Sequence, residues 1–222
     1  MEIPPILDIL ITVFVFLFAI TVHEAAHAWT ALKHGDPTAA ALGRVSLNPL
    51  VHIDLIGTVI LPAFLIYTSI TTGGRIPVFG WAKPVPYNPR NLGNARRGGL
   101  WISFAGPIAN ILTALVATML YRSLRFAGAF AVDPSQPVPI AGVAALLEAT
   151  VNINIVLAFF NLIPVPPLDG SGILAGLLSG RAAVKFEQLR PYGFFLLLFL
   201  FFSRAIDLLF VPVRHLINWL LF

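Results

Sequence analysis

Thr21-Val22-His23-Glu24-Ala25-Ala26-His27-Ala28-Trp29 is the stretch that decides how this chain is interpreted. It carries a His-Glu-x-x-His pattern in an apolar segment, and residues four apart lie on one face of a helix. His23 and His27 can therefore direct their imidazoles at one zinc ion. Glu24 can reach a water at that metal without being a ligand, as a general base for hydrolysis must. The alternative is a pair of buried histidines bonded to neighbours, with Glu24 at a membrane boundary.

The composition is that of a membrane protein. The 222 residues are 58% hydrophobic and 11% charged, with 18 Phe and a mean hydropathy of +0.87, which is outside the range of soluble domains. Ionisable groups inside a membrane helix are costly and persist mainly where they have a partner or a function, which strengthens the metal interpretation.

Cysteine content and charge narrow the possible functions further. The chain has no cysteine, so disulfides are excluded and any metal site must use His, carboxylate or amide groups. The formal charge of +4 is spread between apolar segments without forming a basic face, so no nucleic-acid partner is expected.

Hydropathy along the chain predicts an all-α polytopic membrane protein with about four transmembrane helices, because about 20 apolar residues span a bilayer. The predicted spans are residues 5–32, 100–121, 140–163 and 191–211. No linker or composition break divides them. We therefore expect one membrane-embedded domain over 1–222, with a core at 6–180 and a C-terminal span and tail at 191–222.

Two further segments have a distinct pattern. The apolar run at 57–70 is only about 14 residues long and contains Pro62, which suits a re-entrant element better than a crossing. Residues 213–222 predict a C-terminal amphipathic helix at the membrane interface.

Amides and small residues lie inside the predicted spans. Asn154 and Asn161 are seven apart and share a helix face, which predicts an interior polar stripe, because hydrocarbon offers an amide no partner. Ala105-Gly106-Pro107, with Asn110 close behind, opens another span. Small residues there would let a second helix approach closely.

Asp169 is the candidate third ligand. A catalytic zinc site usually has three protein ligands and one open position, and the two histidines leave one ligand missing. Asp169 follows an apolar span and a proline-rich break that frees it to turn inward. On these residues alone, an ordinary turn in which Asp169 bonds its own backbone is the stronger interpretation.

Three motifs in order change that balance. They are His23-Glu24-x-x-His27 in the first span, Ala105-Gly106-Pro107 in a middle span, and Asn161-x-x-Pro164-x-Pro166-Pro167-Leu168-Asp169-Gly170 after a later one. Together they resemble the site-2 protease family of intramembrane zinc metalloproteases, over roughly residues 6 to 180. The resemblance implies that His23, His27 and Asp169 bind one zinc ion per chain. It also implies that Glu24 is the catalytic acid/base and that Asn161 contacts the substrate.

The chain is similar to the short bacterial and archaeal members of that family, which carry Phe79-Gly80-Trp81-Ala82-Lys83-Pro84-Val85-Pro86. It has no room for the PDZ insertion of many relatives. The expected substrate is a transmembrane protein segment that unwinds locally, because helical peptide bonds are shielded by their own hydrogen bonds. An exposed strand edge at 81–86 could hold it by β-augmentation, with Trp81 and Val85 as substrate contacts, or the segment could be a structural plug.

Charge distribution predicts the orientation. If 57–70 is re-entrant, ten of the 14 Lys and Arg fall on the histidine side of the membrane, which the positive-inside rule assigns to the cytoplasm. These ten are Lys33, Arg44, Arg75, Lys83, Arg90, Arg96, Arg97, Arg181, Lys185 and Arg190. The predicted location is a prokaryotic plasma membrane with the active site toward the cytoplasm.

Other interpretations remain open. A metal or proton transporter could use the same His/Asp cluster, and an inactive scaffold could bind transmembrane helices. Glu24 argues against both, because neither needs a base beside the metal. His52 is a possible extra ligand, although bonding to Asp54 or to backbone is preferred. Arg204 and Asp207, three apart in the last span, are predicted to pair.

Overall fold

The computed structural model describes residues 4–72, 80–130, 138–203 and 205–222. These residues form helices and loops, with no strand among them. Three helices are long and apolar enough to cross a membrane: α1 (Pro5–Lys33), α4 (Ala95–Phe126) and α5 (Val138–Asn161). A bent pair of helical segments near the C-terminus makes a fourth crossing if it is counted as one span. The predicted all-α polytopic architecture is confirmed.

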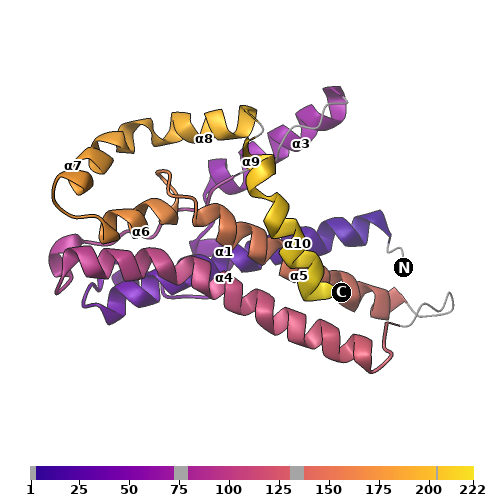
Figure 1. Ribbon diagram of the computed structural model, residues 1–222. Coiled ribbons are helices and arrows are strands. Elements are labelled where there is room, and N and C mark those ends of the chain that lie inside the picture. The colour runs from indigo at the N-terminus through magenta and orange to yellow at the C-terminus, as the bar shows by residue number, and fades with distance from the viewer. Residues whose placement is uncertain (1–3, 73–79, 131–137, 204) are drawn as a thin grey trace.

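α1, α4 and α5 run alongside one another and form a bundle (Figure 1). α4 is its central helix, because it packs against α1, against α5 and, through its first half, against the short α6 (Asp169–Leu177). Asn94 caps the start of α4 by accepting a hydrogen bond from the Arg97 N–H, a usual device at a helix N-terminus. α5 ends at Asn161, just before the prolines that precede α6.

The C-terminal helix α10 (Val211–Leu221) is packed on the bundle. Val213, Ile217 and Leu220 are buried in one core cluster with residues of α4 and α5. Arg122 of α4 donates hydrogen bonds to the carbonyls of Trp219 and Leu220. The predicted amphipathic tail is therefore helical, and its apolar face is covered by α4 and α5.

Between α1 and α4 the chain makes a long excursion through short elements. These are α2 (Thr38–Ala41), η1 (Pro49–Val51), η2 (Leu55–Ile60), α3 (Leu61–Thr72) and η3 (Pro89–Asn91). After α3 the chain returns to the segment that precedes α3. Two hydrogen bonds show this: the Trp81 N–H donates to the Gly57 carbonyl (3.1 Å) and the Lys83 N–H to the His52 carbonyl (2.9 Å). A re-entrant element at 57–70 requires such a return, since its two ends must lie on one side of the membrane.

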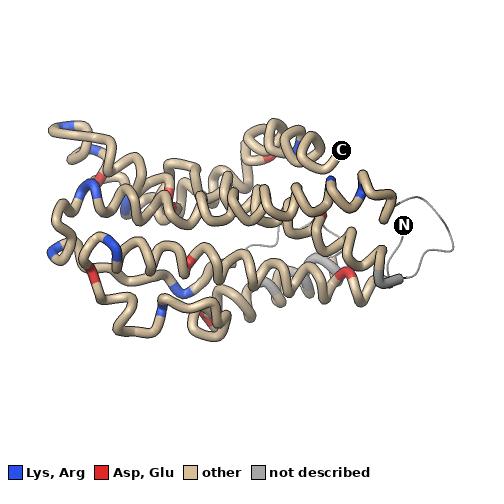
Figure 2. Tube along the Cα trace, turned by 90° about the horizontal axis from the view of Figure 1, so that it is seen from below, with Lys and Arg blue, Asp and Glu red and all other residues tan. Residues whose placement is uncertain are grey.

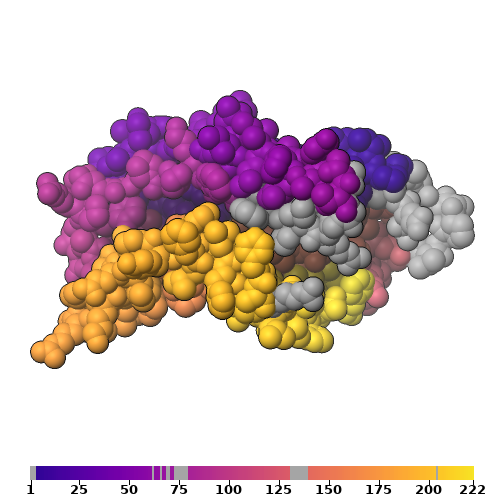
Figure 3. Space-filling model, turned by 90° about the horizontal axis from the view of Figure 1, so that it is seen from above, coloured from indigo at the N-terminus to yellow at the C-terminus, as the bar shows by residue number. Residues whose placement is uncertain are grey.

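The predicted last span, 191–211, is divided among several helices. α7 (Gly180–Leu189), η4 (Arg190–Tyr192) and α8 (Gly193–Phe202) lead to a bend of 80°, after which α9 (Ala205–Leu209) and α10 follow. α3 and α8 lie on the same face of the molecule (Figure 3). The Phe residues of α8 point largely outward, with Phe202 85% exposed, as suits a surface facing lipid. Arg204 is outside the described residues, so its predicted pairing with Asp207 is too.

Candidate metal centre

α1 and α6 bring three ligand-type side chains together. His23 and His27 lie one helical turn apart on α1 and are both buried, and Asp169 is the first residue of α6. Asp169 Oδ2 lies 3.0 Å from His23 Nε2 and 3.3 Å from His27 Nε2. One ligand atom from each residue can be chosen so that all three lie within 4.8 Å of one another. Side chains more than 140 positions apart therefore form one cluster.

The hydrogen bonds on the far side of each imidazole show which atoms face the cluster. His23 Nδ1 lies 2.6 Å from Asn110 Oδ1, and His27 Nδ1 lies 2.6 Å from the Ile102 carbonyl oxygen. Both partners are acceptors, so each Nδ1 carries a proton, and in the neutral imidazole that binds a metal Nε2 then has the lone pair. These two lone pairs point at the carboxylate of Asp169.

Such an arrangement fits a metal ion. Asp169 Oδ2 is buried and has no other hydrogen-bond partner. With both imidazoles neutral, three electron pairs converge there, and a cation would relieve their repulsion. Ligand atoms of a tetrahedral zinc site, with bonds of about 2.0–2.1 Å, are roughly 3.3 Å apart. The nitrogen and oxygen spacings here match that value, and the donor set of two imidazoles and a carboxylate suits zinc.

Gly106 of α4 makes room for the histidines. A Cβ atom at Gly106 would lie 2.5 Å from His27 Nε2 and 2.6 Å from His23 Nε2. The small residues of Ala105-Gly106-Pro107 were predicted to let a second helix approach closely. The helix that packs there is α1, which carries His23 and His27.

α4 also positions Asp169, by holding α6 along its length. Gly172 packs directly against the Ser103 side chain, and a Cβ at Gly176 would lie 2.5 Å from the Leu100 Cβ. Arg96 donates to the carbonyls of Gly176 (2.8 Å) and Leu177 (2.7 Å), which are free acceptors at the end of α6. α4 therefore supports both halves of the cluster.

A cavity of about 380 Å³ opens onto the cluster. Its walls include apolar side chains of α1 and α5, such as Phe16, Ile20, Leu157 and Phe160. All seven site residues predicted from the sequence line it: His23, Glu24, His27, Trp81, Val85, Asn161 and Asp169. The side-chain amide of Asn161 donates to the Leu157 carbonyl (3.0 Å), which fixes its orientation on α5.

Comparisons with known proteins agree with this geometry. A family model described as Peptidase family M50 matches residues 11–201. This chain belongs to peptidase family M50. The family resemblance drawn from the three motifs is thereby confirmed.

Curated relatives cover most of the chain. It is 34% identical over 189 residues to "Putative zinc metalloprotease YwhC" of Bacillus subtilis (strain 168), covering 85% of this chain and 78% of the relative. It is 28% identical over 194 residues to "Putative zinc metalloprotease Rip2" of Mycolicibacterium smegmatis, covering 86% and 66%. A Rip2 protein of Mycobacterium tuberculosis is 27% identical over 196 residues, with the same coverage. No solved structure matched the chain.

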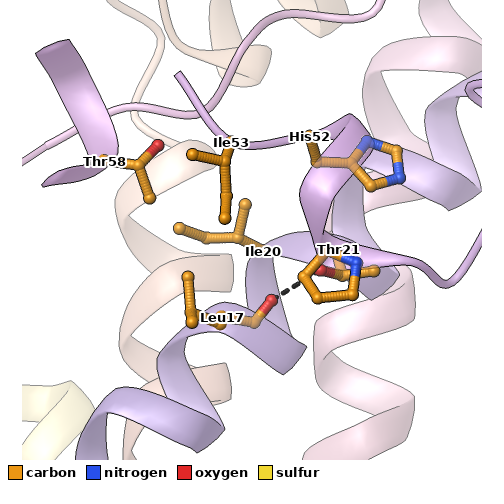
Figure 4. Close-up of a pocket in the computed structure, with 7 residues that line it drawn as sticks. Leu17, Ile20, Thr21, His52, Ile53 and Thr58 are labelled. Atoms are coloured by element: carbon orange, nitrogen blue, oxygen red, sulfur yellow. Dashed lines mark hydrogen bonds between the residues drawn. The ribbon is translucent and has the colours of Figure 1, made fainter. Parts of the chain in front are cut away.

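His52 lies outside the candidate metal centre. His52 is buried and lines a small pocket together with Leu17, Ile20 and Thr21 of α1 (Figure 4). Its Nε2 lies 2.8 Å from the Ser46 carbonyl oxygen, so it bonds to backbone, the preferred alternative to a ligand role. Asp54, the other partner considered, instead caps η2 by accepting from the N–H groups of Ile56 and Gly57.

Sequence reasoning missed the support that Asn110 gives to His23. Asn110 was noted only as one polar residue in a span, yet it is fully buried and bonded to a candidate ligand. Asn154, assigned to an interior stripe, is also fully buried and accepts a hydrogen bond from Asn110 (2.8 Å). The available signal was that two amides in apolar helices need partners, and one such partner is an imidazole.

Proposed function

We propose that this protein is a zinc-dependent endopeptidase that cuts membrane proteins within or near their transmembrane segments. The observation that carries the proposal is the convergence of two imidazole lone pairs and an unpartnered carboxylate oxygen, beside Glu24, on a cavity between membrane-type helices. The zinc metalloprotease names of the relatives support it. We further propose that residues 1–222 act as one domain.

His23, His27 and Asp169 would hold one zinc ion. Bound there, zinc would lower the pKa of a coordinated water and polarise a peptide carbonyl. Glu24 would take the proton from the attacking water and return it to the leaving amide nitrogen. Asn161, on the cavity wall, would contact the peptide near the bond that breaks.

The surroundings of the site support a transmembrane substrate. Much of the cavity wall is apolar, and it lies between helices long enough to cross a bilayer. A peptide bond can be attacked only after its helical hydrogen bonds open, so the substrate would bind in a locally extended form.

The segment at 80–86 would hold that extended peptide. The N–H groups of Trp81 and Lys83 are already bonded inside the chain. Because successive groups of an extended segment face opposite sides, the free edge would present Ala82 and Pro84. Trp81 and Val85 would contribute side chains to the cavity wall.

An Ala82→Pro variant tests this edge, because Pro84 and Pro86 have no N–H and Ala82 supplies the remaining donor. We expect a KM roughly tenfold higher, about the value of one hydrogen bond, with little change in kcat. Ala82→Val, which keeps the N–H, is the matched control. Equal KM values for the two variants would favour the structural plug instead.

The central experiment separates catalysis from metal binding. Purified protein in lipid nanodiscs would be assayed for zinc content and for cleavage of single-span peptides. Glu24→Gln should retain zinc and lose cleavage by a factor of roughly 100 to 10,000, whereas His27→Ala and Asp169→Ala should lose both. Glu148→Gln, on the carboxylate that accepts from Tyr121, is the matched control.

The rival functions give other outcomes in that assay. A transporter would move ions without cutting peptides and would lose transport in His23→Ala. A scaffold would bind peptides without cutting them. Cleavage retained by Glu24→Gln would refute the hydrolytic mechanism.

We propose that the site faces the cytoplasm of a bacterial cell. Lys and Arg residues gather at the end of the bundle where α4 begins and α6 leads into α7 (Figure 2). Because the chain has no cysteine, single-cysteine variants can report topology. A cysteine at Arg181 should resist a membrane-impermeant maleimide in intact cells, and one at Arg125 should react. The reverse pattern would contradict the orientation.

A further inference from the structure

We propose that Asn110 and Asn154 act as an amide relay that orients His23 and thereby sets the affinity of the metal site. This inference rests on the proposed zinc function and assigns the two residues a positioning role, not a catalytic one. Asn110 Oδ1 lies 2.6 Å from His23 Nδ1, and Asn110 Nδ2 donates to Asn154 Oδ1 at 2.8 Å. The relay thus connects α1 through α4 to α5.

The direction of every hydrogen bond in the relay follows from its ends. Asn154 Nδ2 lies 2.9 Å from the Thr150 carbonyl oxygen, and Asn110 Nδ2 lies 3.1 Å from the Ala19 carbonyl oxygen. A backbone carbonyl can only accept, so both amide nitrogens must face these oxygens. Turning the Asn110 amide over would set its oxygen against two other acceptors. Asn110 Oδ1 must therefore face His23.

This orientation has one consequence at the metal site. Because Asn110 Oδ1 accepts, His23 Nδ1 must carry the proton, and the lone pair of His23 is held on Nε2, which points at Asp169. The Asn154 side chain keeps Asn110 in that orientation without touching the histidine.

The two imidazoles are held in different ways. His27 Nδ1 donates to a backbone carbonyl, that of Ile102, which no side-chain substitution removes. His23 Nδ1 is held by a side chain, that of Asn110, and both Asn110 and Asn154 are fully buried and out of contact with solvent. His23 is therefore the candidate ligand whose affinity for the metal can be changed by substituting the side chains that support it.

A purely adhesive role is the competing explanation, because buried amides also join membrane helices. Adhesion accounts for the bonds from Asn110 to Asn154 and to Ala19. It does not need the amide oxygen of Asn110 to face a candidate ligand. The two explanations differ in what they predict for metal binding.

The test measures zinc affinity by competition with a chelating dye, together with the visible absorption of the Co²⁺-substituted protein. Loss of a hydrogen bond to a metal-binding histidine typically weakens metal binding 10- to 100-fold. We expect a loss in that range for Asn110→Leu and about tenfold for Asn154→Leu, with a changed Co²⁺ spectrum in both. Asn154→Asp keeps an oxygen to accept from Asn110, and a carboxyl kept neutral by burial can donate from its other oxygen to the Thr150 carbonyl. Its zinc affinity should therefore stay within about threefold of that of the unaltered protein.

Asn152→Leu is the matched control, because Asn152 lies on the same helix but is exposed and donates to the Glu148 carbonyl of its own helix. Unchanged zinc affinity and Co²⁺ spectrum in Asn154→Leu would overturn the relay, even if Asn110→Leu fails to fold. Equal zinc losses in Asn154→Asp and Asn154→Leu would also overturn it in favour of adhesion. Absence of zinc binding by the unaltered protein would instead overturn the proposed function.

Discussion

The contacts within the inner bundle of α1, α4, α5 and α6 and the surface of the outer helix α8 use different kinds of residue. Close contacts in the inner bundle involve glycines and buried amides, such as Gly106 and Asn110. Nine of the ten residues of α8 are Phe or Leu, and many of them are exposed, as Phe199 is at 67%. Lipid is as apolar as a phenylalanine, so burying such residues against protein brings little gain in a membrane. The candidate metal site accordingly lies where small and polar residues allow close, specific contact.

Gly106→Ala should break the inner bundle most severely. The added methyl group would lie within 2.6 Å of both candidate ligands, so α1 and α4 must separate. A displacement near 1 Å can cost roughly 100-fold in rate, and we expect at least that loss in peptide cleavage, with weaker zinc binding. Gly99→Ala on the same helix is the control, because its Cβ would lie 3.6 Å from the Tyr87 hydroxyl, an ordinary contact. Equal activity of the two variants would contradict the close approach.

The carboxylate of Asp36, in the loop after α1, is expected to make the stability of the protein depend on pH. Burial alone would raise the pKa of its carboxyl, but hydrogen bonds from Thr38, Asn91 and Asn88 lower that pKa from 3.8 to about 2. A lowered pKa stabilises the folded state above pH 3.8, and that stability is lost as the pH falls through 2. The loss should be about 2 kcal/mol.

Thermal unfolding of the metal-free protein in detergent between pH 5 and pH 2 measures this loss. Asp36→Asn should be less stable at pH 5 and show a smaller decline with acid. An identical acid dependence in the two proteins would show that Asp36 does not couple stability to pH.

Arg96→Gln should loosen α6 moderately. Arg96 holds two carbonyls at the end of α6, but it is exposed, so the loss should be about 1 kcal/mol. Amide hydrogen exchange in α6 should accelerate about fivefold, with little change in α5. Arg97→Gln is the control, because Arg97 is the next residue of α4 and is also exposed. The same acceleration in both variants would mean that the effect is one of charge alone.

Phe199→Ala should have the smallest effect. Its side chain is mostly exposed, and a change at such a position should alter stability by less than about 0.5 kcal/mol in lipid. Val151→Ala, at a fully buried position of α5, should cost more. If Phe199→Ala destabilised the protein as much as Val151→Ala, α8 would be an integral part of the packed bundle.

Much of the site was predictable because its parts obey local rules. Two histidines four apart share a helix face whatever surrounds them, and the length of an apolar run sets whether it can span a bilayer. The return of the chain at Gly57 and Trp81 agrees with the short length of the run at 57–70. The packing of α10 on α4 and α5 and the bend after α8 were not predicted, because apolar residues look alike in sequence whether they face protein or lipid.

The sequence by itself determined that this is a helical membrane protein with a histidine pair and a glutamate on one helix, because those features depend only on hydropathy and helical periodicity. Only the tertiary structure decided that Asp169 Oδ2 makes no hydrogen bond within its own turn and lies beside the two histidines. It also decided that Asn110 faces His23. These contacts depend on how closely α1 and α6 pack against α4, and a few glycines set those interhelical distances. The spacing of residues in the sequence does not predict those distances.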